Sequence, residues 1–393
     1  MTILFFTNIS PFPANGGEKI RSYYLLKALS QLGHKVIAVI CNEENVNLAN
    51  YGIDNVIFYT HPKKPLTMIE RITWKHLFQQ DAGIIRLFED IFRKHRIDAA
   101  LLDYGTIGQY ISFFTGRQIP VILGTHNAQP MITQQVPAKS LFQKIRKFQL
   151  VNLEKLHERL YFKHAAATLV VSDQDRKYHE RFLKKERVFV VPNFLDETEY
   201  TLVNKKQPKV LVMTANFGVY MNYTGLKWFI EEVWDDALAG QFDLWLVGRN
   251  SKEALQQITG SEQWKNIVAL GKVDDVKWYI SVASGVIIPL LHGSGTRLKC
   301  LEAMALRTPI ISTAKGVEGV VSNNFIIADS AAGLKTAIAA FKGDTRTGEA
   351  LREDFMKEYS AEVNRRRLND IINYALNGKG TKVVSEPAVS VEQ

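Results

Sequence analysis

The architecture of the chain follows from one segment, Val286-Ile-Ile-Pro-Leu-Leu-His-Gly-Ser-Gly-Thr-Arg-Leu-Lys-Cys-Leu-Glu302. The apolar residues at its start predict a buried strand. The glycines after them predict a tight loop, and the remaining residues predict a helix. Gly293 and Gly295 would let the backbone approach a ligand closely, and the unpaired amides of the following helix would bind an anion. Arg297 and Lys299 fall in the first helical turn, where the helix dipole disfavours cations unless an anion is bound.

This loop also has a simpler interpretation. The glycines would then be turn residues, Arg297 would be solvated, and Lys299 would pair with Glu302 three residues further on. Spacing alone leaves both interpretations open, because glycine loops are common in α/β proteins.

The residues that follow complete a βαβ unit. Leu298, Leu301 and Ala305 share one face of the predicted helix, and Pro309-Ile-Ile-Ser-Thr313 predicts the next buried strand. Through Gly316-Val-Glu-Gly319, the whole run resembles the donor-binding signature of glycosyltransferase family 4, the group 1 glycosyltransferases. The resemblance implies a retaining enzyme of the GT-B fold, an α/β fold with two Rossmann-like doubly wound parallel-sheet domains facing across a cleft.

The resemblance also implies roles for the residues of the loop. Glu302 would bind the ribose hydroxyls of a nucleoside diphosphate sugar, because a carboxylate can accept two hydrogen bonds. The diphosphate would be held by the Arg297 guanidinium and by the backbone amides of Ser294, Gly295, Thr296, Arg297 and Leu298. The family usually has two glutamates separated by seven residues, and Ser294 stands here in place of the first.

Length and charge restrict the class of protein. The 393 residues suit two domains, and 46% hydrophobic with 23% charged residues is typical of a globular protein. The net charge of +9 calls for an anionic partner, such as nucleotide phosphates, an anionic lipid surface or nucleic acid. We expect no nucleic acid partner, because the basic residues are spread over predicted helices without aromatic stacking motifs.

Cysteine usage and the amino terminus bear on localisation. Cys41 and Cys300 are the only cysteines and lie far apart in apolar βα contexts, so we expect neither a disulfide nor a cysteine metal site. Met1-Thr-Ile-Leu-Phe-Phe6 lacks a basic n-region and predicts a strand, and no apolar run reaches the roughly 18 residues of a spanning helix. We therefore expect a cytoplasmic protein.

Strand and helix patterns alternate along both halves of the chain. They predict an N-terminal acceptor-side Rossmann-like domain over 1–195, an interdomain linker over 196–208 and a C-terminal nucleotide-sugar-binding Rossmann-like domain over 209–350. Helices are predicted over 351–376, and in GT-B proteins the last helix crosses back to the first domain. Residues 377–393 predict a mobile tail. The segment before Arg96 predicts one long helical region.

Two loops of the first domain are candidates for substrate contact. Gly16 and Gly17 precede a predicted helix that carries Arg21, and as a lone diglycine they are also consistent with a simple turn. The arrangement resembles the first loop of the family, which lies against donor phosphate and acceptor. His126 follows a predicted strand, and a histidine seen there in isolation is also consistent with a purely structural role. The resemblance implies that it hydrogen-bonds a hydroxyl of the transferred sugar.

Three further positions are predicted to contact the donor. Asn216 and Arg249 each follow a predicted strand of the second domain, and Arg249 is also consistent with a solvated side chain. Val273 lies in Gly271-Lys-Val273, which resembles the segment of the family that brackets the base.

Asp173-Gln-Asp175 spells the Asp-x-Asp of metal-dependent transferases. Ser172 before it predicts a helix cap with Asp175 as its acidic partner, which we favour over a metal site. No other cluster has the spacing of metal ligands. We therefore expect no metal and no cofactor, with the nucleoside diphosphate sugar as substrate.

One predicted helix has the composition of a membrane-surface helix. Lys139, Lys144, Arg146 and Lys147 lie in a stretch without carboxylates, interleaved with Leu141, Phe142, Ile145 and Phe148. The alternative is an ordinary surface helix that packs its apolar stripe on a sheet. In the first interpretation the protein would be peripheral at the inner face of an anionic membrane.

The resemblance implies a metal-independent, retaining glycosyltransferase of the hexosyltransferase type. It would move a sugar from a nucleoside diphosphate to a carbohydrate or lipid-linked acceptor, as in cell-surface polysaccharide or glycolipid synthesis. Ser294 motivates one alternative, a non-catalytic nucleotide-sugar-binding partner subunit. A sugar-nucleotide epimerase is a third hypothesis, although the clusters of acidic catalytic residues expected for it are not evident.

Overall fold

The computed structural model describes residues 1–14, 17–42, 53–63, 65–203, 206–293 and 297–377. The chain divides into two compact units: unit 1 comprises Met1–Asn193 with the segment from Asn364 onward, and unit 2 comprises Phe194–Val363. Within the described ranges, none of the helices has the length and hydropathy needed to cross a bilayer.

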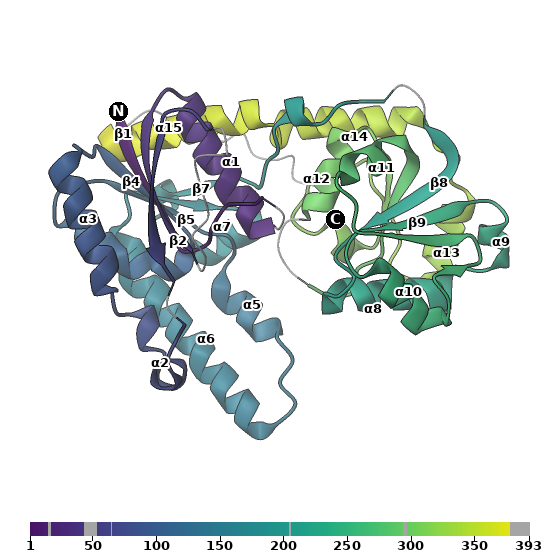
Figure 1. Cartoon of the computed structure of the whole chain (residues 1–393), viewed down its shortest axis with the longest axis horizontal. Helices are drawn as coiled ribbons and strands as arrows, with labels where there is room; N and C mark the ends of the chain where they lie inside the picture. The colour runs from purple at the N-terminus through teal and green to yellow at the C-terminus, as the bar shows by residue number, and fades with distance from the viewer. Residues whose placement is uncertain (15–16, 43–52, 64, 204–205, 294–296, 378–393) are drawn as a thin grey trace. The chain divides into compact units, whose positions relative to one another are not determined.

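Unit 1 contains a parallel sheet whose strand order is β3-β2-β1-β4-β5-β6-β7 (Figure 1). The strands are β1 Thr2–Thr7, β2 Lys35–Asn42, β3 Val56–Pro62, β4 Ala99–Asp103, β5 Val121–Gly124, β6 Ala167–Val170 and β7 Val188–Val190. Runs such as Ile3 to Phe6 are fully buried, because helices cover both faces of a parallel sheet.

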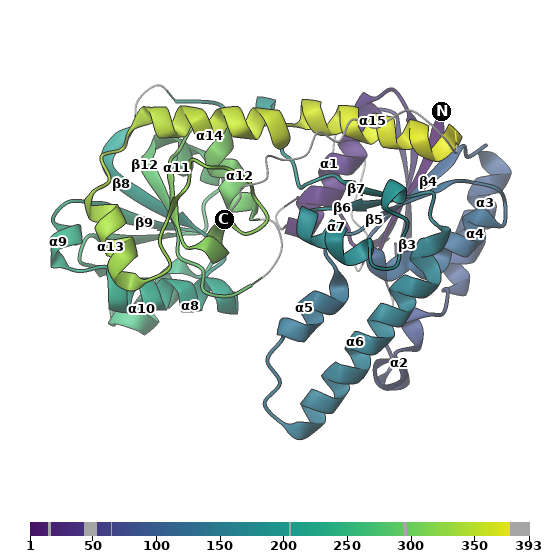
Figure 2. The same ribbon diagram turned by 180° about the vertical axis from the view of Figure 1, so that it is seen from behind.

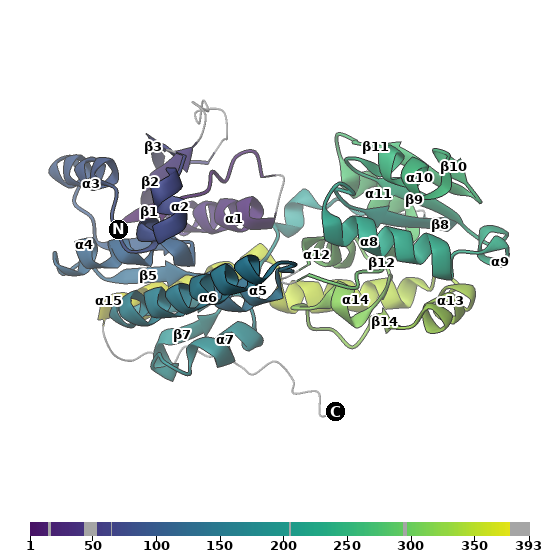
Figure 3. The same ribbon diagram turned by 90° about the horizontal axis from the view of Figure 1, so that it is seen from below.

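The helices of unit 1 lie on both faces of this sheet. They are α1 Gly17–Gln31, α2 Met68–Thr73, α3 Ala82–Lys94, α4 Ile111–Thr115, α5 Gln129–Gln135, α6 Leu141–Tyr161, α7 Asp173–His179 and α15 Ala361–Asn377. Phe88 of α3 and Phe114 of α4 belong to the core on one face. On the other face, Tyr374 of α15 packs edge-on against Phe189 of β7. Figure 2 shows α15 beside this sheet. Figure 3 shows α5 and α6 side by side.

Unit 2 contains a second sheet, with strand order β10-β11-β9-β8-β12-β13-β14 and one antiparallel pair, β10 with β11. The strands are β8 Gln207–Thr214, β9 Asp243–Val247, β10 Gln263–Trp264, β11 Ile267–Gly271, β12 Ala283–Ile288, β13 Ile310–Ser312 and β14 Ile326–Ile327. The helices are α8 Tyr220–Trp228, α9 Asp236–Ala239, α10 Ser251–Thr259, α11 Val276–Val282, α12 Leu298–Ala305, α13 Ala331–Ala339 and α14 Thr345–Glu358.

Each sheet has a point at which the strand order reverses, between β1 and β4 in unit 1 and between β8 and β12 in unit 2. Open α/β sheets bind ligands at such points, beyond the carboxyl ends of the strands. Three of the candidate loops follow strands at these points, after β1, β8 and β12, and the other three follow β5, β9 and β11.

The structure differs from the sequence prediction in the segment 196–208. Leu195, the last residue of the predicted first domain, belongs to unit 2 and is buried, as is Tyr200 within the segment, and Asp196 caps a short 3₁₀ helix. The backbone of Leu195 bonds to Tyr359 and Ala361. Polar composition suggested a linker, but these side chains are fixed by contacts with residues far along the chain.

The predicted helical segments also divide differently. Helix α14 belongs to unit 2, and only residues from Asn364 onward, in α15, belong to unit 1. The long helical region before Arg96 is two helices, α2 and α3, because Trp74 ends α2 in a left-handed conformation with φ 55°. The predicted tail lies outside the described residues, except for Asn377.

Candidate functional site

In unit 2, the loop between β12 and α12 brings a glycine against two side chains. Gly293 has φ 112°, and a Cβ there would lie 2.8 Å from the Met221 sulfur and 3.2 Å from Nη2 of Arg297. Only glycine fits this position without displacing its neighbours. Ser294, Gly295 and Thr296, for which amide contacts to a diphosphate are predicted, lie outside the described residues.

Arg297 is the N-cap residue of α12 and is 7% exposed. Its Nε donates to the carbonyl of Lys315 at 3.3 Å, and its Nη2 lies 3.5 Å from Oε2 of Glu318. Burial lowers the pKa of Arg297 and the Glu318 charge opposes this shift, yet a guanidinium stays protonated. The solvated arginine of the simpler interpretation is therefore wrong: the charge is held inside the loop.

Lys299 is half-buried in the first turn of α12, and its Nζ donates to Oδ1 of Asn222 at 3.2 Å. Its pKa is lowered to about 8, chiefly by burial and also by the neighbouring Arg297 charge, while the Glu302 charge opposes the shift. The side chain thus bonds to an amide of α8 rather than to the carboxylate of Glu302. Two cations share the start of one helix, which is the arrangement that an anion stabilises.

Glu302 lies one turn further along α12 and is half-buried. Its pKa is raised to about 7, chiefly by burial and also by the Asp275 charge, while the charges of Lys277 and Lys299 oppose the shift. Such a carboxyl lies close to its ionisation point at neutral pH and would gain from hydroxyl donors. Leu298, the other predicted residue here, begins the helix.

The loops after β8, β9 and β11 are joined at the same edge of the sheet. The amide of Phe217 donates to the carbonyl of Arg249 at 2.8 Å, and the amide of Gly248 donates to the carbonyl of Gly271 at 2.8 Å. These bonds bring the segments of Asn216, Arg249 and Val273 together, and their contact with a donor stays a prediction. The Arg249 side chain is exposed, which agrees with its solvated alternative.

Asn222 ties these loops to α12, and the sequence analysis did not identify it. Its Nδ2 donates to the carbonyl of Asn216 at 2.9 Å while its Oδ1 accepts from Lys299. Glu318, which pairs with Arg297 and Lys315, was also missed. Glu318 lies inside the Gly316–Gly319 motif, so the sequence could have identified it as a site residue. The sequence around Asn222 contains no motif that predicts its role.

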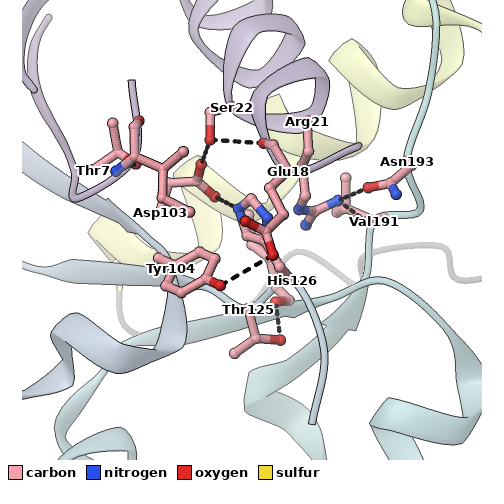
Figure 4. Close-up of polar contacts among 12 residues, drawn as sticks. Thr7, Glu18, Arg21, Ser22, Asp103, Tyr104, Thr125, His126, Val191 and Asn193 are labelled. Atoms are coloured by element: carbon pink, nitrogen blue, oxygen red, sulfur yellow. Dashed lines mark hydrogen bonds and ion pairs between the residues drawn. The ribbon is translucent and has the colours of Figure 1, made fainter. Parts of the chain in front are cut away.

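In unit 1, His126 lies beyond β5 and its Nε2 is 3.1 Å from Oδ1 of Asp103, the last residue of β4 (Figure 4). The other carboxylate oxygen of Asp103 accepts from Ser22 at 2.5 Å. Burial alone would raise the pKa of Asp103, but the charge and hydrogen bond of His126, with Arg21 and Ser22, lower it. An ionised carboxylate only accepts, so Nε2 is the donor. Nδ1 has no hydrogen bond to a residue that the structure describes and could meet a ligand.

Tyr104 follows Asp103 with φ 139°, a conformation that residues with a Cβ rarely adopt. Its ring lies 4.8 Å from the imidazole of His126, and its hydroxyl donates to Oε1 of Glu18 at 3.2 Å. Backbone strain of this kind gathers at functional sites, because only a well-packed surrounding sustains it.

Arg21, on α1, is 2% exposed and lies beside this group. Its Nη1 donates to the carbonyl of Val191 at 3.0 Å and to Oδ1 of Asn193 at 3.2 Å (Figure 4). Burial lowers its pKa, and the charges of Asp103 and Asp175 oppose the shift. Gly17 begins α1, and Gly16 lies outside the described residues.

The predicted cap at Ser172 is confirmed, although the carboxylate of Asp175 accepts from the Ser172 hydroxyl and not from its backbone amide as a capping box would require. Ser172 is the N-cap of α7, and its Oγ accepts from the amide of Asp175. Oδ1 of Asp175 also accepts from the amide of Ala128 at 2.9 Å, which fixes the loop after His126. Among the residues with described positions, no three His, Cys, Asp or Glu side chains gather as metal ligands would.

Two family models match the chain. The one described as Glycosyltransferase Family 4 matches residues 15–199, and the one described as Glycosyl transferases group 1 matches residues 208–344. Each model falls on one of the two sheets and includes the candidate residues there. The chain belongs to the group 1, family 4 glycosyltransferases.

Solved structures similar to this glycosyltransferase show the GT-B fold. Sucrose-phosphate synthase from Thermosynechococcus elongatus has 17% identity and a TM-score of 0.72, over 96% of this chain and all (100%) of that one. Anabaena HepE in complex with UDP and glucose has 12% identity and a TM-score of 0.65, over 94% and 99%. WaaG, a glycosyltransferase involved in lipopolysaccharide biosynthesis, has 14% identity and a TM-score of 0.64, over 94% and 99%.

A comparison with curated proteins found no match to this glycosyltransferase. The identities to the solved structures are low, so these structures establish the fold and do not assign the sugar or the acceptor.

Proposed function

We propose that the chain moves a sugar from a nucleoside diphosphate to a carbohydrate or lipid-linked acceptor with retention of anomeric configuration. One observation carries the proposal. Arg297 and Lys299 are drawn out of water at the start of α12, where the helix dipole adds to their positive charge. A diphosphate would stabilise this arrangement, since it brings negative charge to the start of α12 in addition to the Glu318 carboxylate that lies beside Arg297.

In the proposed reaction, the two cations stabilise the negative charge that develops on the leaving diphosphate. As the bond from the anomeric carbon to the diphosphate breaks, the leaving oxygen becomes more negative. The Arg297 guanidinium and the Lys299 ammonium would stabilise this charge more strongly in a half-buried site than in water. The proposal gives these two cations the role that a metal ion has in other transferases, and the leaving phosphate would accept the proton of the acceptor hydroxyl.

Two carboxylates have separate roles in the proposal. Glu302 would accept hydrogen bonds from the ribose hydroxyls of the donor. Asp103 would act as a positioning residue: by holding Nε2 of His126 it leaves Nδ1 for a hydroxyl of the transferred sugar. UDP-glucose is the first donor to test, because the HepE structures contain UDP and UDP-glucose.

Titration calorimetry with UDP and UDP-glucose tests the donor site. Arg297→Ala and Glu302→Ala should each weaken binding about tenfold or more, since each removes a hydrogen bond with a charged partner. Arg346→Ala, which removes an exposed arginine paired with Asp344, is the matched control. If both site variants bound every nucleoside diphosphate tested as the wild type does, the donor site would be rejected.

Turnover separates an enzyme from a non-catalytic binding subunit. Release of UDP from UDP-glucose, with the anomeric configuration of the product read by NMR, should occur in the wild type and be lost in His126→Ala. Donor binding without any release or transfer over a panel of acceptors would favour the binding subunit, and an inverted product would reject retention.

A further inference from the structure

Helix α2 buries none of its side chains. None of the residues of Met68–Thr73 is buried, and Met68, Ile69 and Ile72 are 78%, 66% and 53% exposed. The helix is nevertheless held in place, because Thr67 and Glu70 form a reciprocal capping box at its start. A short capped helix that offers its apolar residues to the outside needs a partner to cover them.

The amino-terminal end of α6 exposes a second apolar group. Leu141, Phe142, Ile145 and Phe148 recur at the spacing of one helical face and are between 50% and 75% exposed. The alternative prediction for this stretch, that the apolar stripe packs on the sheet of its own domain, is therefore wrong. Its apolar residues face outward, away from the core of unit 1.

One arginine joins the two groups. Nη2 of Arg146 donates to the carbonyl of Arg71 at 2.8 Å, and its guanidinium lies 5.2 Å from the centre of the Trp74 ring and 5.8 Å from that of Phe142. Figures 1 and 2 both show α2 beside α6. The exposed apolar residues of the two helices thus form one surface, which we call the α2–α6 surface. Its apolar members are Leu66, Met68, Ile69, Ile72, Leu141, Phe142, Ile145 and Phe148.

The charge around the α2–α6 surface has one sign. Residues 136–153 contain no carboxylate, and residues 65–76 contain only Glu70, which is engaged in the cap. The basic residues of these two segments are Arg71, Lys75, Lys139, Lys144, Arg146 and Lys147. An apolar face bordered by cations is complementary to an anionic lipid leaflet, whose head groups attract the cations while its acyl region accepts the apolar side chains.

We infer that the α2–α6 surface docks unit 1 on an anionic membrane, with Phe142 and Phe148 inserted at the interface and Lys139 and Lys144 against the head groups. Lys147 donates to the carbonyls of Gln134 and Val136, which ties the carboxyl end of α5 to α6. The surface is therefore fixed in shape before it binds. This docking does not depend on the proposed transfer reaction, and it would bring the protein to a membrane whatever its acceptor.

Cosedimentation of the full chain with vesicles tests the inference. The wild type should bind vesicles of phosphatidylglycerol and phosphatidylcholine in equal parts, and bind pure phosphatidylcholine weakly. Phe142→Ser combined with Phe148→Ser should reduce binding about tenfold or more. The matched control is Val321→Ser with Ile327→Ser, which removes two apolar residues of unit 2 that are each 49% exposed.

A second pair of variants tests whether the basic residues contribute to membrane binding. Lys139→Gln with Lys144→Gln should weaken binding to the anionic vesicles about threefold to tenfold and reduce its salt dependence. Lys209→Gln with Lys342→Gln, two exposed lysines of unit 2, should bind as the wild type does. All variants replace exposed residues, so circular dichroism and thermal melting should match the wild type.

Several outcomes would overturn the inference. Equal binding to neutral and anionic vesicles would show that the basic residues do not attract the membrane. Binding of the double phenylalanine variant at the wild-type level would show that the α2–α6 surface is not the docking site. The alternative partner for this surface is a second copy of the chain, and light scattering measures whether the protein is a dimer. A wild-type dimer that becomes a monomer in the phenylalanine variant, together with no vesicle binding, would assign the surface to self-association instead.

Discussion

Nε2 of His126 lies 3.1 Å from Oδ1 of Asp103, and both side chains are buried at the carboxyl edge of the first sheet. The carboxylate is held ionised by the histidine, by Arg21 and by Ser22 despite its burial. Its charge therefore contributes both to the orientation of the imidazole and to the stability of unit 1.

Asp103→Asn should lower the free energy of unfolding at neutral pH by about 3 kcal/mol, because it breaks a buried charged pair. The pKa of Asp103 is lowered in the folded protein. Its stabilisation is thus present above its unfolded pKa and is lost as the pH falls through the lower, folded value. The wild type should lose stability below about pH 4, and the variant should lose less. Denaturant unfolding at a series of pH values measures this loss of stability.

The control variant is Asp90→Asn, which removes an exposed pair with Arg93 and should change the free energy of unfolding by about 0.5 kcal/mol or less.

Lys299 should make the affinity for UDP fall at alkaline pH. Burial lowers the pKa of its ammonium to about 8, so in the free protein the charge that attracts a diphosphate disappears as the pH rises through that value. Lys299→Met should bind UDP about tenfold more weakly at neutral pH and lose the alkaline decline. Lys227→Met, which removes a surface pair with Glu231, should keep the wild-type profile. A decline that persisted unchanged in Lys299→Met would assign it to another group.

Glu302 should produce a decline on the acid side. Its pKa is raised to about 7 by burial, so the carboxylate that accepts from the ribose is protonated as the pH falls below neutrality. The affinity of the wild type for UDP should fall there. Glu302→Gln, which keeps the size of the side chain and cannot ionise, should bind more weakly near pH 8 and show no acid decline. Calorimetry over the same pH series as for Lys299 provides the measurement, and an acid decline retained in Glu302→Gln would contradict the assignment.

Gly248→Ala should destabilise unit 2 strongly. Gly248 has φ 133°, and a Cβ there would lie 1.9 Å from the carbonyl oxygen of Ala215, a backbone atom of the residue that follows β8 and bonds through its amide to Val247. We expect a loss of about 3 kcal/mol or more, with a loss of UDP binding, since the loops after β8 and β9 must separate. Gly260→Ala is the control for strain alone, because Gly260 has φ 80° and nothing lies within 4 Å of its Cβ position. It should cost about 1 kcal/mol. Equal losses in the two variants would show that the contact with Ala215 has no effect.

The sequence by itself determined the order of the elements and the loops that carry chemistry. Apolar runs such as Ala99–Asp103 are long enough, and apolar enough, to be strands whatever surrounds them, and this strand has the predicted bounds. Ser172 and Asp175 form their cap within one turn, so local chemistry predicts it. The placement of Arg297 and Lys299 at the start of a helix was predicted correctly for the same reason.

Only the tertiary structure decided which of these groups meet. Asn222 contacts Lys299 across 77 positions of sequence, and Arg21 reaches Val191 across 170. Arg146 joins α6 to Arg71 across 75, and this contact assembles an exposed surface from two separate helices. No local pattern encodes such pairs. They arise because parallel strands bring their carboxyl ends to one edge and because long side chains span the packed helices, so distances along the chain cease to matter once the sheets have formed.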